Sequence, residues 1–323
     1  MKYLLLSIIL SFTFLCSSQY WGRNTESEFT NEAMDVEIDS QGNSYVAGYI
    51  TGETAFDINV AEQISPGNGD VYISKYNTNG DLVWVKRFGG NLSDRAYDLA
   101  IDENDQVYVT GQFYGQVDFG GIILTSVNNS KDIFVLKMDA QGNVLWAISE
   151  GGSDSENVYG ITTDSQNNVV LTGQFTGVSS IGGQTFTSYI DPVTLLPSYD
   201  LFLSKYDTNG NPLWTIIGQA NYEERGLAVS VDSQDNIFLT GQFSDTLYFG
   251  GQQINNVGYN IGFLSKISPT GQVEWVNLLR AGLVMAYDLE VNDTDEVVVI
   301  GDYLGNFLYT TLIGSGSIPS KHI

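Results

Sequence analysis

The chain has 323 residues, of which 38 are acidic and 13 basic, so its formal net charge is −25 at pH 7. This charge disfavours nucleic acid and anionic membrane surfaces as partners, because both are recognised through clusters of Lys and Arg, and the sequence contains no such cluster. It suits a well-solvated protein or one that gathers cations. Tyr, Phe and Gly are abundant and no long stretch repeats apolar residues at helical spacing, which favours strands and turns.

The first 18 residues are predicted to be a secretory signal peptide. Lys2 gives a positive start, and Leu4–Leu15 is an apolar core too short to span a bilayer. Cys16, followed by two serines, supplies small residues for cleavage, which would leave Gln19 as the first residue of a mature chain without cysteine. A lipoprotein anchor at Cys16 is the less favoured alternative, since Leu15 is bulky. We therefore expect export, no disulfide and no transmembrane segment.

From residue 21 onward, one module repeats at intervals of 60 to 68 residues. Three landmark series keep this interval, and coincidence is a poor explanation for three series in step. The landmarks are Trp21, Trp84, Trp146, Trp214 and Trp275; Lys75, Lys137, Lys205 and Lys266; and Gly48, Gly111, Gly173, Gly241 and Gly301. They divide residues 19–323 into modules of about 21–83, 84–145, 146–213 and 214–274, with a partial fifth at 275–323.

The second module shows the expected internal pattern most clearly. Each strand is short, and polar turns rich in Asp, Asn and Gly separate the strands as in hairpins. The connection Tyr114–Lys131 also has room for a short extra hairpin at Ile122–Val127. The four predicted strands are Ala96–Ile101, Val107–Phe113, Asp132–Met138 and Asn143–Ser149.

Some of these strands are apolar on both faces, and that decides how the modules pack. Ile133–Leu136 and Leu201–Leu203 are continuous apolar runs, as expected for a strand covered from both sides. Sheets stacked face to face around an axis cover every module in this way. We therefore predict an all-β chain that forms a β-propeller of four-stranded antiparallel blades, four complete and a fifth partial. A glycine inside the second strand, such as Gly111, indicates close approach of the adjoining blade.

The two ends of the repeat predict an incomplete array. Gln19–Trp21 corresponds to a fourth strand without its first three, of the kind that completes the last blade of many propellers. Ser320–Ile323 aligns with Ser130–Ile133, so the third strand of the fifth module is expected to begin where the sequence stops. We therefore expect a C-terminally truncated piece of a longer array.

The repeated motif resembles a known family. Asp39–Gly48 carries Asp-x-x-Gly-Asn-x-Tyr-Val-x-Gly, and Asp70–Trp84 and Asp200–Trp214 carry Asp-x-x-x-x-Lys-Tyr-Asp/Asn-x-x-Gly-x-x-x-Trp. This pattern resembles the SBBP β-propeller repeat of secreted bacterial proteins. The resemblance implies the propeller fold, export, often from Bacteroidetes-like bacteria, and often a C-terminal sorting or adhesion module. It implies no catalytic residues.

Little in the sequence points to catalysis. The repeated Lys and Trp are most simply explained as parts of the blade, with each Lys pairing with a carboxylate or extending along a strand end. His322 is the only histidine, so the sequence lacks the residues for a histidine-based nucleophilic triad or a histidine metal site. We expect no enzyme. The alternative is a carboxylate-based glycan hydrolase, since a glycosidase needs only two acids and many are present.

Asp94, Glu156 and Glu224 are candidate calcium ligands, because they occupy equivalent positions in the links between modules. In a propeller these links lie near the axis, where clustered carboxylates could hold Ca²⁺. Asn31 and Val284 break the series, and a solvated acidic rim or a backbone cap is the alternative interpretation. The turn Asp102–Gln106 lacks the spacing of an EF-hand loop and is interpreted as a turn. No other cofactor is expected.

An insertion makes the third module longer than the others. Within it Tyr189, Leu195, Leu196 and Tyr199 form a candidate platform for a partner or glycan, with simple loop drift as the alternative. Together the features predict a secreted interaction or scaffold module, cell-surface or adhesion-related, that binds protein or carbohydrate. The alternatives are a lectin-like glycan binder and the carboxylate hydrolase.

Overall fold

The computed structural model describes residues 31–56, 63–192, 194–220, 222–256, 260–279, 283–303 and 310–313. The expected signal peptide, its cleavage site, Trp21 and His322 lie outside these residues. Within them, the regular structure is β-strand apart from the short 3-10 turn η1 (Val127–Asn129). No helix in this part of the chain is long and apolar enough to cross a membrane.

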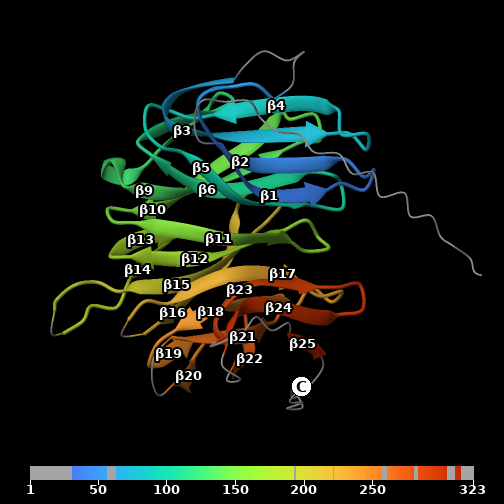
Figure 1. Ribbon diagram of the computed structural model, residues 1–323. Helices are drawn as coiled ribbons and strands as arrows, with labels where there is room; N and C mark the ends of the chain where they lie inside the picture. The colour runs from blue at the N-terminus through green and yellow to red at the C-terminus, as the bar shows by residue number, and fades with distance from the viewer. Residues whose placement is uncertain are drawn as a thin grey trace, which may run out of the picture.

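The sequence repeat folds into five antiparallel sheets in series, which succeed one another in chain order in Figure 1. Sheet 1 contains β1 (Asn31–Ile38), β2 (Ser44–Thr54), β3 (Gln63–Tyr76) and β4 (Leu82–Phe88). Sheet 2 contains β5 (Arg95–Ile101), β6 (Val107–Tyr114), β9 (Lys131–Met138) and β10 (Val144–Gly152). Sheet 3 contains β11 (Glu156–Thr163), β12 (Val169–Thr176), β15 (Tyr199–Tyr206) and β16 (Pro212–Gln219).

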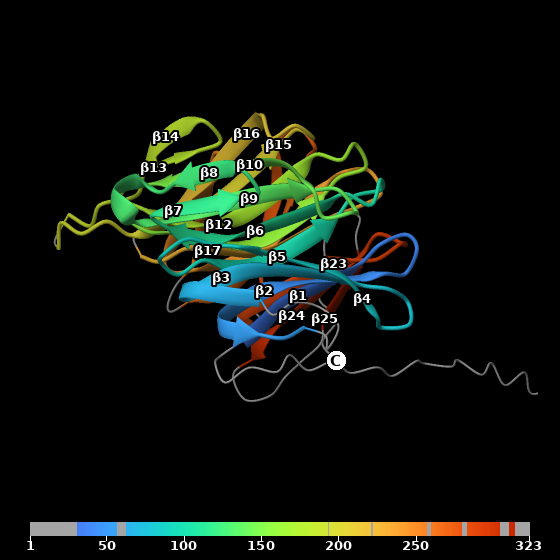
Figure 2. The ribbon, with the colours of Figure 1, turned by 90° about the horizontal axis from the view of Figure 1, so that it is seen from above.

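Sheets 4 and 5 continue the series. Sheet 4 contains β17 (Arg225–Val231), β18 (Ile237–Phe243), β21 (Ile261–Ile267) and β22 (Val273–Leu278). Sheet 5 contains β23 (Leu283–Val291), β24 (Glu296–Tyr303) and β25 (Thr310–Ile313). The first strands of successive sheets contact one another, and the sheets fan around them (Figure 2). This is the arrangement of blades in a β-propeller, as expected from the doubly apolar strands. The number of blades in a closed ring stays a prediction.

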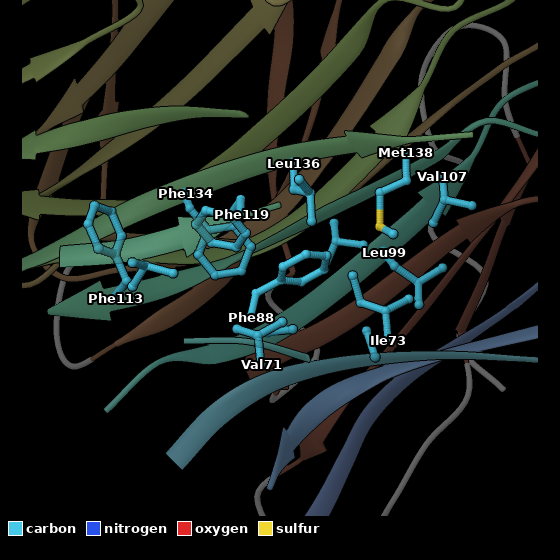
Figure 3. Close-up of a cluster of buried hydrophobic side chains, with 14 of the residues drawn as sticks. Val71, Ile73, Phe88, Leu99, Val107, Phe113, Phe119, Phe134, Leu136 and Met138 are labelled. Carbon is cyan, nitrogen blue, oxygen red and sulfur yellow. The ribbon is translucent and has the colours of Figure 1, made fainter. Parts of the chain in front are cut away.

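The apolar strands fill the space between sheets on both sides. On β9, Phe134 and Leu136 pack toward sheet 1, whereas Ile133 and Val135 pack toward sheet 3. Figure 3 shows the first of these cores, where Phe88, Phe119 and Phe134 meet. Full burial of each such side chain contributes about 1.5–3 kcal/mol, so a single sheet without neighbours would lose most of its stabilisation.

Short accessory hairpins tie each sheet to the one before it. The hairpins β7–β8 (Gln116–Phe119, Ile122–Thr125), β13–β14 (Val178–Ile181, Gln184–Thr187) and β19–β20 (Thr246–Phe249, Gln252–Asn255) lie between the second and third strands of sheets 2, 3 and 4. β13 pairs with β10 of sheet 2, and β19 pairs with β16 of sheet 3. Each pairing covers part of an outer strand that would otherwise present unpaired backbone groups.

The in-strand glycines are explained by a bulge, not by the adjoining blade as the sequence suggested. The first strand of each sheet skips one residue, as between Ala96 and Asp98 on β5. A Cβ added at Gly111 would collide with the carbonyl oxygen of Arg95 and with Phe134, both in the same sheet. The close approach is therefore that of the neighbouring strand where it bulges.

At the hairpin turns, successive sheets are joined by the same set of hydrogen bonds. A lysine on the third strand and the tryptophan on the fourth both donate to one carbonyl in the next sheet's turn. We call each such set a clasp. The acceptors are Ala140 for Lys75 and Trp84, Thr208 for Lys137 and Trp146, and Pro269 for Lys205 and Trp214.

Each clasp lysine also pairs with the aspartate that begins its own sheet's first turn. The Nζ–Oδ2 distance is 3.1 Å for Lys75–Asp39 and 2.7 Å for Lys205–Asp164, with these side chains at most 10% exposed. Asp164 also accepts the N–H groups of Gln166 and Asn168, as the turn interpretation of these segments requires. These contacts agree with a structural role for the repeated lysines and tryptophans.

Sheet 5 differs from the sequence expectation at its third strand. The alignment of Ser320 with Ser130 places that strand at the end of the chain, but Thr310–Ile313 pairs with β24, from Glu296↔Ile313 to Val299↔Thr310. The backbone groups on the free edge of β24 need partners, and this segment supplies them.

Candidate functional site

A cavity of about 510 Å³ lies on the axis, lined by the first strands of all five sheets. Its walls come from β1, β5, β11, β17 and β23, so no single module makes it. Pockets of this size, built where several elements converge, are the usual place for a ligand. It is therefore the first candidate site.

Carboxylates enter this cavity from three sheets but not from the other two. Asp35, Asp98 and Asp288 occupy the same position just after the bulge, and the equivalent positions in sheets 3 and 4 hold Gly160 and Ala228. Glu37 and Glu290 line the cavity one strand period further along. The acids therefore come from sheets 1, 2 and 5 and do not follow the repeat.

Two of these aspartates also link neighbouring sheets. Asp35 accepts the N–H of Leu99 in sheet 2 at 3.0 Å, and Asp98 accepts the N–H of Ile161 in sheet 3 at 2.8 Å. Burial, together with the nearby Asp35 carboxyl, raises the pKa of Asp98 well above its ordinary value. The Asp35 carboxyl therefore lies close enough to Asp98 to disfavour the charged form of Asp98.

The remaining acids of the cavity are perturbed in the same direction. Burial raises the pKa of Glu37 to about 6, with further contributions from Asp35 and Glu290. The pKa values of Asp288 and Glu290 are also raised, mainly by burial. The residues that line the cavity in the described part of the chain include no Lys, Arg or His. The site therefore gathers several carboxyl groups, and none of its described lining residues is basic.

Tyrosines stand at the bulge beside these acids. Tyr97, Tyr159 and Tyr287 are the bulged residues of β5, β11 and β23, where Met34 and Leu227 stand in β1 and β17. All three residues line the cavity. Tyrosine offers an aromatic face and a hydroxyl at low entropic cost, which suits recognition of a cation or a sugar.

The structure places Asp94, Glu156 and Glu224 away from the axial cavity. All three are fully buried between successive sheets, each at its own interface, and none lines the cavity. Burial raises the pKa of Asp94 and of Glu156 to about 7. No three acidic, histidine or cysteine side chains in the described residues are grouped to hold a metal ion. A shared rim of these acids at the channel mouth is therefore not formed.

The insertion of the third module forms a hairpin-like finger that projects from the body at the left of Figure 2. Ile190 bridges to Pro197, and Ser198 donates its N–H to the Tyr189 carbonyl. Leu195 and Leu196 are 74% and 65% exposed, whereas Tyr189 and Tyr199 are half-buried at the base. Of the four candidate residues, the two leucines thus lie on the surface at the tip, and the tyrosines support it.

The acids of the cavity can be recognised in the sequence as departures from the repeat. In the aligned first strands, Asp35 and Asp98 stand where Gly160 and Ala228 stand in other modules. A charged residue inside an otherwise apolar strand is costly to bury, so it indicates either a cavity or a partner. Comparison of departures from the repeat, and not only of the repeat itself, would have found them.

Comparisons with known proteins give distant relatives only, and no family model matches the chain. An uncharacterised WD repeat-containing protein, L264 of Acanthamoeba polyphaga mimivirus, is 26% identical over 235 residues, or 61% of this chain and 16% of that protein. The regulatory protein FlaEY of Caulobacter vibrioides is 25% identical over 150 residues, or 45% of this chain and 15% of that protein. The chain thus spans less than a fifth of either relative.

Solved structures are similar at low TM-scores. A Bacteroides caccae protein of unknown function has TM-score 0.40 at 9% identity, covering 73% of this chain and 63% of that one. The WD40 β-propeller domain of Doa1 has TM-score 0.30 at 9% identity, covering 86% and 92%. An extracellular two-component-system domain from Bacteroides thetaiotaomicron has TM-score 0.30 at 11% identity, covering 91% and 40%. The likeness to the SBBP repeat stays a resemblance, and the description of the fold rests on this chain's own strand pairing.

Proposed function

We propose that this chain is a secreted interaction module that binds a positively charged segment of a partner protein at the axial cavity. The observation that carries the proposal is the cavity itself: it is lined by all five first strands, contains carboxylates from three of them and has no internal cation among its described lining residues. Attachment to a cell surface or a role in adhesion would follow from export, which the N-terminal signal predicts.

Charge complementarity supports a basic ligand. Lysine or arginine side chains would find Asp35, Asp98 and Asp288 as acceptors, and the ring faces of Tyr97 and Tyr159 as cation–π partners. The net charge of −25 would steer such a segment toward the protein and speed its association at low salt. Leu195 and Leu196 on the projecting finger supply a separate apolar contact for the same partner.

A carboxylate-based glycan hydrolase is the second candidate, favoured by one observation. Asp35 and Asp98 are close enough to influence each other, and Asp98 has a raised pKa, as a general acid needs. Both carboxylates already accept backbone N–H groups, which holds them in place but occupies part of their hydrogen-bonding capacity. Lectin-like binding of a glycan by the cavity tyrosines uses the same surface.

Labelled protein applied to arrays of basic, neutral and acidic peptides and to a glycan array would separate these functions. The proposal expects selective binding to Lys/Arg-rich peptides that weakens as salt is raised. Changing Asp35→Asn and Asp98→Asn together should reduce binding at least tenfold, whereas Leu195→Ser on the finger should reduce it less. Binding to glycans alone, or release of reducing ends from a polysaccharide that D98N abolishes, would overturn the protein-binding proposal.

A further inference from the structure

One joint between neighbouring sheets is open. The first strands of sheets 1 to 5 contact one another in succession, but β23 of sheet 5 and β1 of sheet 1 have no comparable contact among the described residues. Both strands nevertheless line the axial cavity, where Glu37 of β1 and Glu290 of β23 interact electrostatically. The back of sheet 5, which faces away from sheet 4, and the front of sheet 1, which faces away from sheet 2, therefore border this open joint.

The front of sheet 1 is exposed at a position that sheets 2 to 5 bury. In each first strand, the residue that follows the position of Asp35 faces the preceding sheet. In sheets 2 to 5 this residue is at most 7% exposed and is Leu99, Ile161, Val229 or Leu289. Val36 occupies the position in sheet 1 and is 57% exposed. A neighbouring sheet is therefore missing from this face.

The back of sheet 5 is exposed in the same way. Ile300 pairs with Asp288 on the face opposite to Val299, which packs toward sheet 4. The residues that take the place of Ile300 in sheets 1 to 4 are fully buried: Ala47, Thr110, Thr172 and Thr240. Ile300 is 43% exposed. Apolar side chains thus stand on both sides of the open joint, at positions that a neighbouring sheet covers elsewhere.

A hydrogen bond that recurs between sheets indicates how these two faces would fit. The axial aspartates of sheets 1 and 2 each accept the N–H of the buried apolar residue just described in the next sheet. Gly160 takes the aspartate's place in sheet 3, and a Cβ there would lie 3.2 Å from the backbone nitrogen of Val229. Asp288 has this position in sheet 5, where it accepts the N–H of Leu289 beside it. The equivalent donor for Asp288 in sheet 1 is the N–H of Val36.

The first turns of the sheets also suit contact between sheets 5 and 1. A serine in one turn donates its N–H and hydroxyl to an aspartate in the next, as Ser40 to Asp105, Ser165 to Asp235 and Ser233 to Asp295. Where sheet 2 has Glu103 in place of the serine, sheet 3 has Asn167 in place of the aspartate. Sheet 5 has Asp293 in place of the serine, and sheet 1 has Gly42 in place of the aspartate. Two carboxylates would therefore not meet if sheet 5 packed against sheet 1.

The charges that oppose this contact lie at the axis. Asp35 and Glu37 come from sheet 1, and Asp288 and Glu290 from sheet 5. The positions equivalent to Glu37 in sheets 2, 3 and 4 hold uncharged residues, namely Ala100, Thr162 and Ser230. Like charges on the two sides of the open joint repel each other, and a cation between them would offset that repulsion. The net charge of −25 also disfavours a second copy of the chain as the partner of these faces.

We propose that sheet 5 closes onto sheet 1 of the same chain when a cationic segment occupies the axial cavity. In the closed form the back of sheet 5 covers Val36, and Asp288 accepts the Val36 N–H as the axial aspartates of sheets 1 and 2 accept theirs. The inference rests on the proposed function, because the cation that draws the sheets together is the ligand proposed for the cavity. Closure makes the site one that holds its ligand by completing the ring.

Cross-linking of the full chain tests the closure. In a Cys16→Ser background, Asp293→Cys and Gln41→Cys place one thiol in the exposed first turn of sheet 5 and one in that of sheet 1. With a short bis-maleimide, hexalysine should raise the yield of the intramolecular cross-link by about threefold or more. The reference pair is Glu103→Cys with Gln166→Cys, at the same positions in sheets 2 and 3, and its yield should not change with the peptide.

Three further variants separate charge from packing. Glu37→Gln together with Glu290→Gln should raise the yield without any peptide, because it removes the repulsion that the cation offsets. Val36→Asp places a carboxylate opposite Asp288 and should abolish the response to hexalysine. Ile123→Asp is the matched control, because Ile123 is an equally exposed apolar residue on β8, outside the open joint, and it should keep the response. Circular dichroism would check that each variant is folded.

The binding of labelled hexalysine, measured by fluorescence anisotropy, distinguishes the ways in which the inference can fail. If the peptide binds and the yield does not rise, closure is wrong and the proposed function stands. If the peptide does not bind, the proposed function fails and this inference with it. A yield that equals that of the reference pair without peptide would mean that the ring is always closed. Cross-links formed only between chains would assign the open joint to a second copy. Each of these results would overturn the proposal.

Discussion

The axial cavity and the clasp turns are built from the same five sheets. The clasp turns repeat one arrangement, whereas the residues of the cavity differ from sheet to sheet. At the turns, three successive sheets repeat one arrangement, in which a buried lysine and a tryptophan reach one carbonyl of the next sheet. At the axis, equivalent positions hold Asp35, Asp98, Gly160, Ala228 and Asp288. The residues that repeat are those that join each sheet to the next. The residues that differ between sheets are those that line the cavity, where we propose that a ligand binds.

The interface between sheets 3 and 4 shows the same contrast on a smaller scale. Its clasp, made by Lys205 and Trp214, follows the rule without change. Its buried acids differ from their counterparts, because Asp200 accepts hydrogen bonds from Tyr189, Ser198 and Gln219, whereas Asp70 pairs with Arg87.

The largest effect on stability is expected from Lys205→Met. Lys205 is 3% exposed at 2.7 Å from Asp164, so its removal leaves a buried carboxylate without its counter-ion and should lower the free energy of unfolding by about 3 kcal/mol. Lys266→Met is the matched control, because its side chain is 22% exposed and its Asp232 partner lies at 3.3 Å. We expect about 1 kcal/mol there. If Lys205→Met and Lys266→Met lowered the free energy of unfolding in urea by the same amount, burial of the clasp lysine would not account for its contribution to stability.

A second prediction concerns the pH dependence of unfolding. Glu150 on β10 accepts Tyr206 Oη at 2.8 Å and the N–H of Gly182, and burial raises its pKa from 4.5 to about 7. A carboxyl whose pKa is raised in the folded state contributes stability that is complete below pH 4.5 and is lost as pH rises through 7. Between these values the wild-type protein should lose roughly 2–3 kcal/mol that Glu150→Gln does not lose. Parallel curves for the two proteins would show that Glu150 titrates normally.

A smaller effect is expected for Trp146→Phe. Trp146 Nε1 donates to the Thr208 carbonyl at 3.0 Å, and its ring packs on Tyr108. Phenylalanine keeps most of the ring contact but not the donor, so the free energy of unfolding should fall by about 1 kcal/mol. Trp275→Phe should cost less, since the described residues give its indole N–H no acceptor in a following sheet. A larger loss for Trp275 than for Trp146 would count against the clasp.

The smallest effect on stability is expected at the axis. Asp98→Asn keeps an oxygen that can accept the Ile161 N–H and removes a carboxyl whose charged form is disfavoured by burial and by Asp35. The free energy of unfolding should therefore change by no more than about 0.5 kcal/mol, in either direction. Thermal unfolding near neutral pH would check this, and a loss as large as that for Lys205→Met would assign Asp98 to the scaffold.

Sequence patterns predicted the strands closely where turn chemistry and apolar runs agree. Asp132–Met138 was expected and β9 covers Lys131–Met138. An extra hairpin was expected at Ile122–Val127, and the structure has one that starts earlier, β7–β8, over Gln116–Thr125. The axial acids were not predicted, because a bulge decides which way an acid in the first strand points. The burial of Glu224 was not predicted either, since a link residue can face solvent or a neighbouring sheet and only packing decides.

The most direct test of the account measures stability and binding on the same two variants. The Asp35→Asn, Asp98→Asn double variant should unfold close to the wild-type temperature yet lose binding to basic peptides. Lys205→Met should unfold well below it yet bind those peptides normally at temperatures where it is folded. The account is contradicted if the axial variant loses stability and keeps binding, or if the clasp variant loses binding while it is still folded.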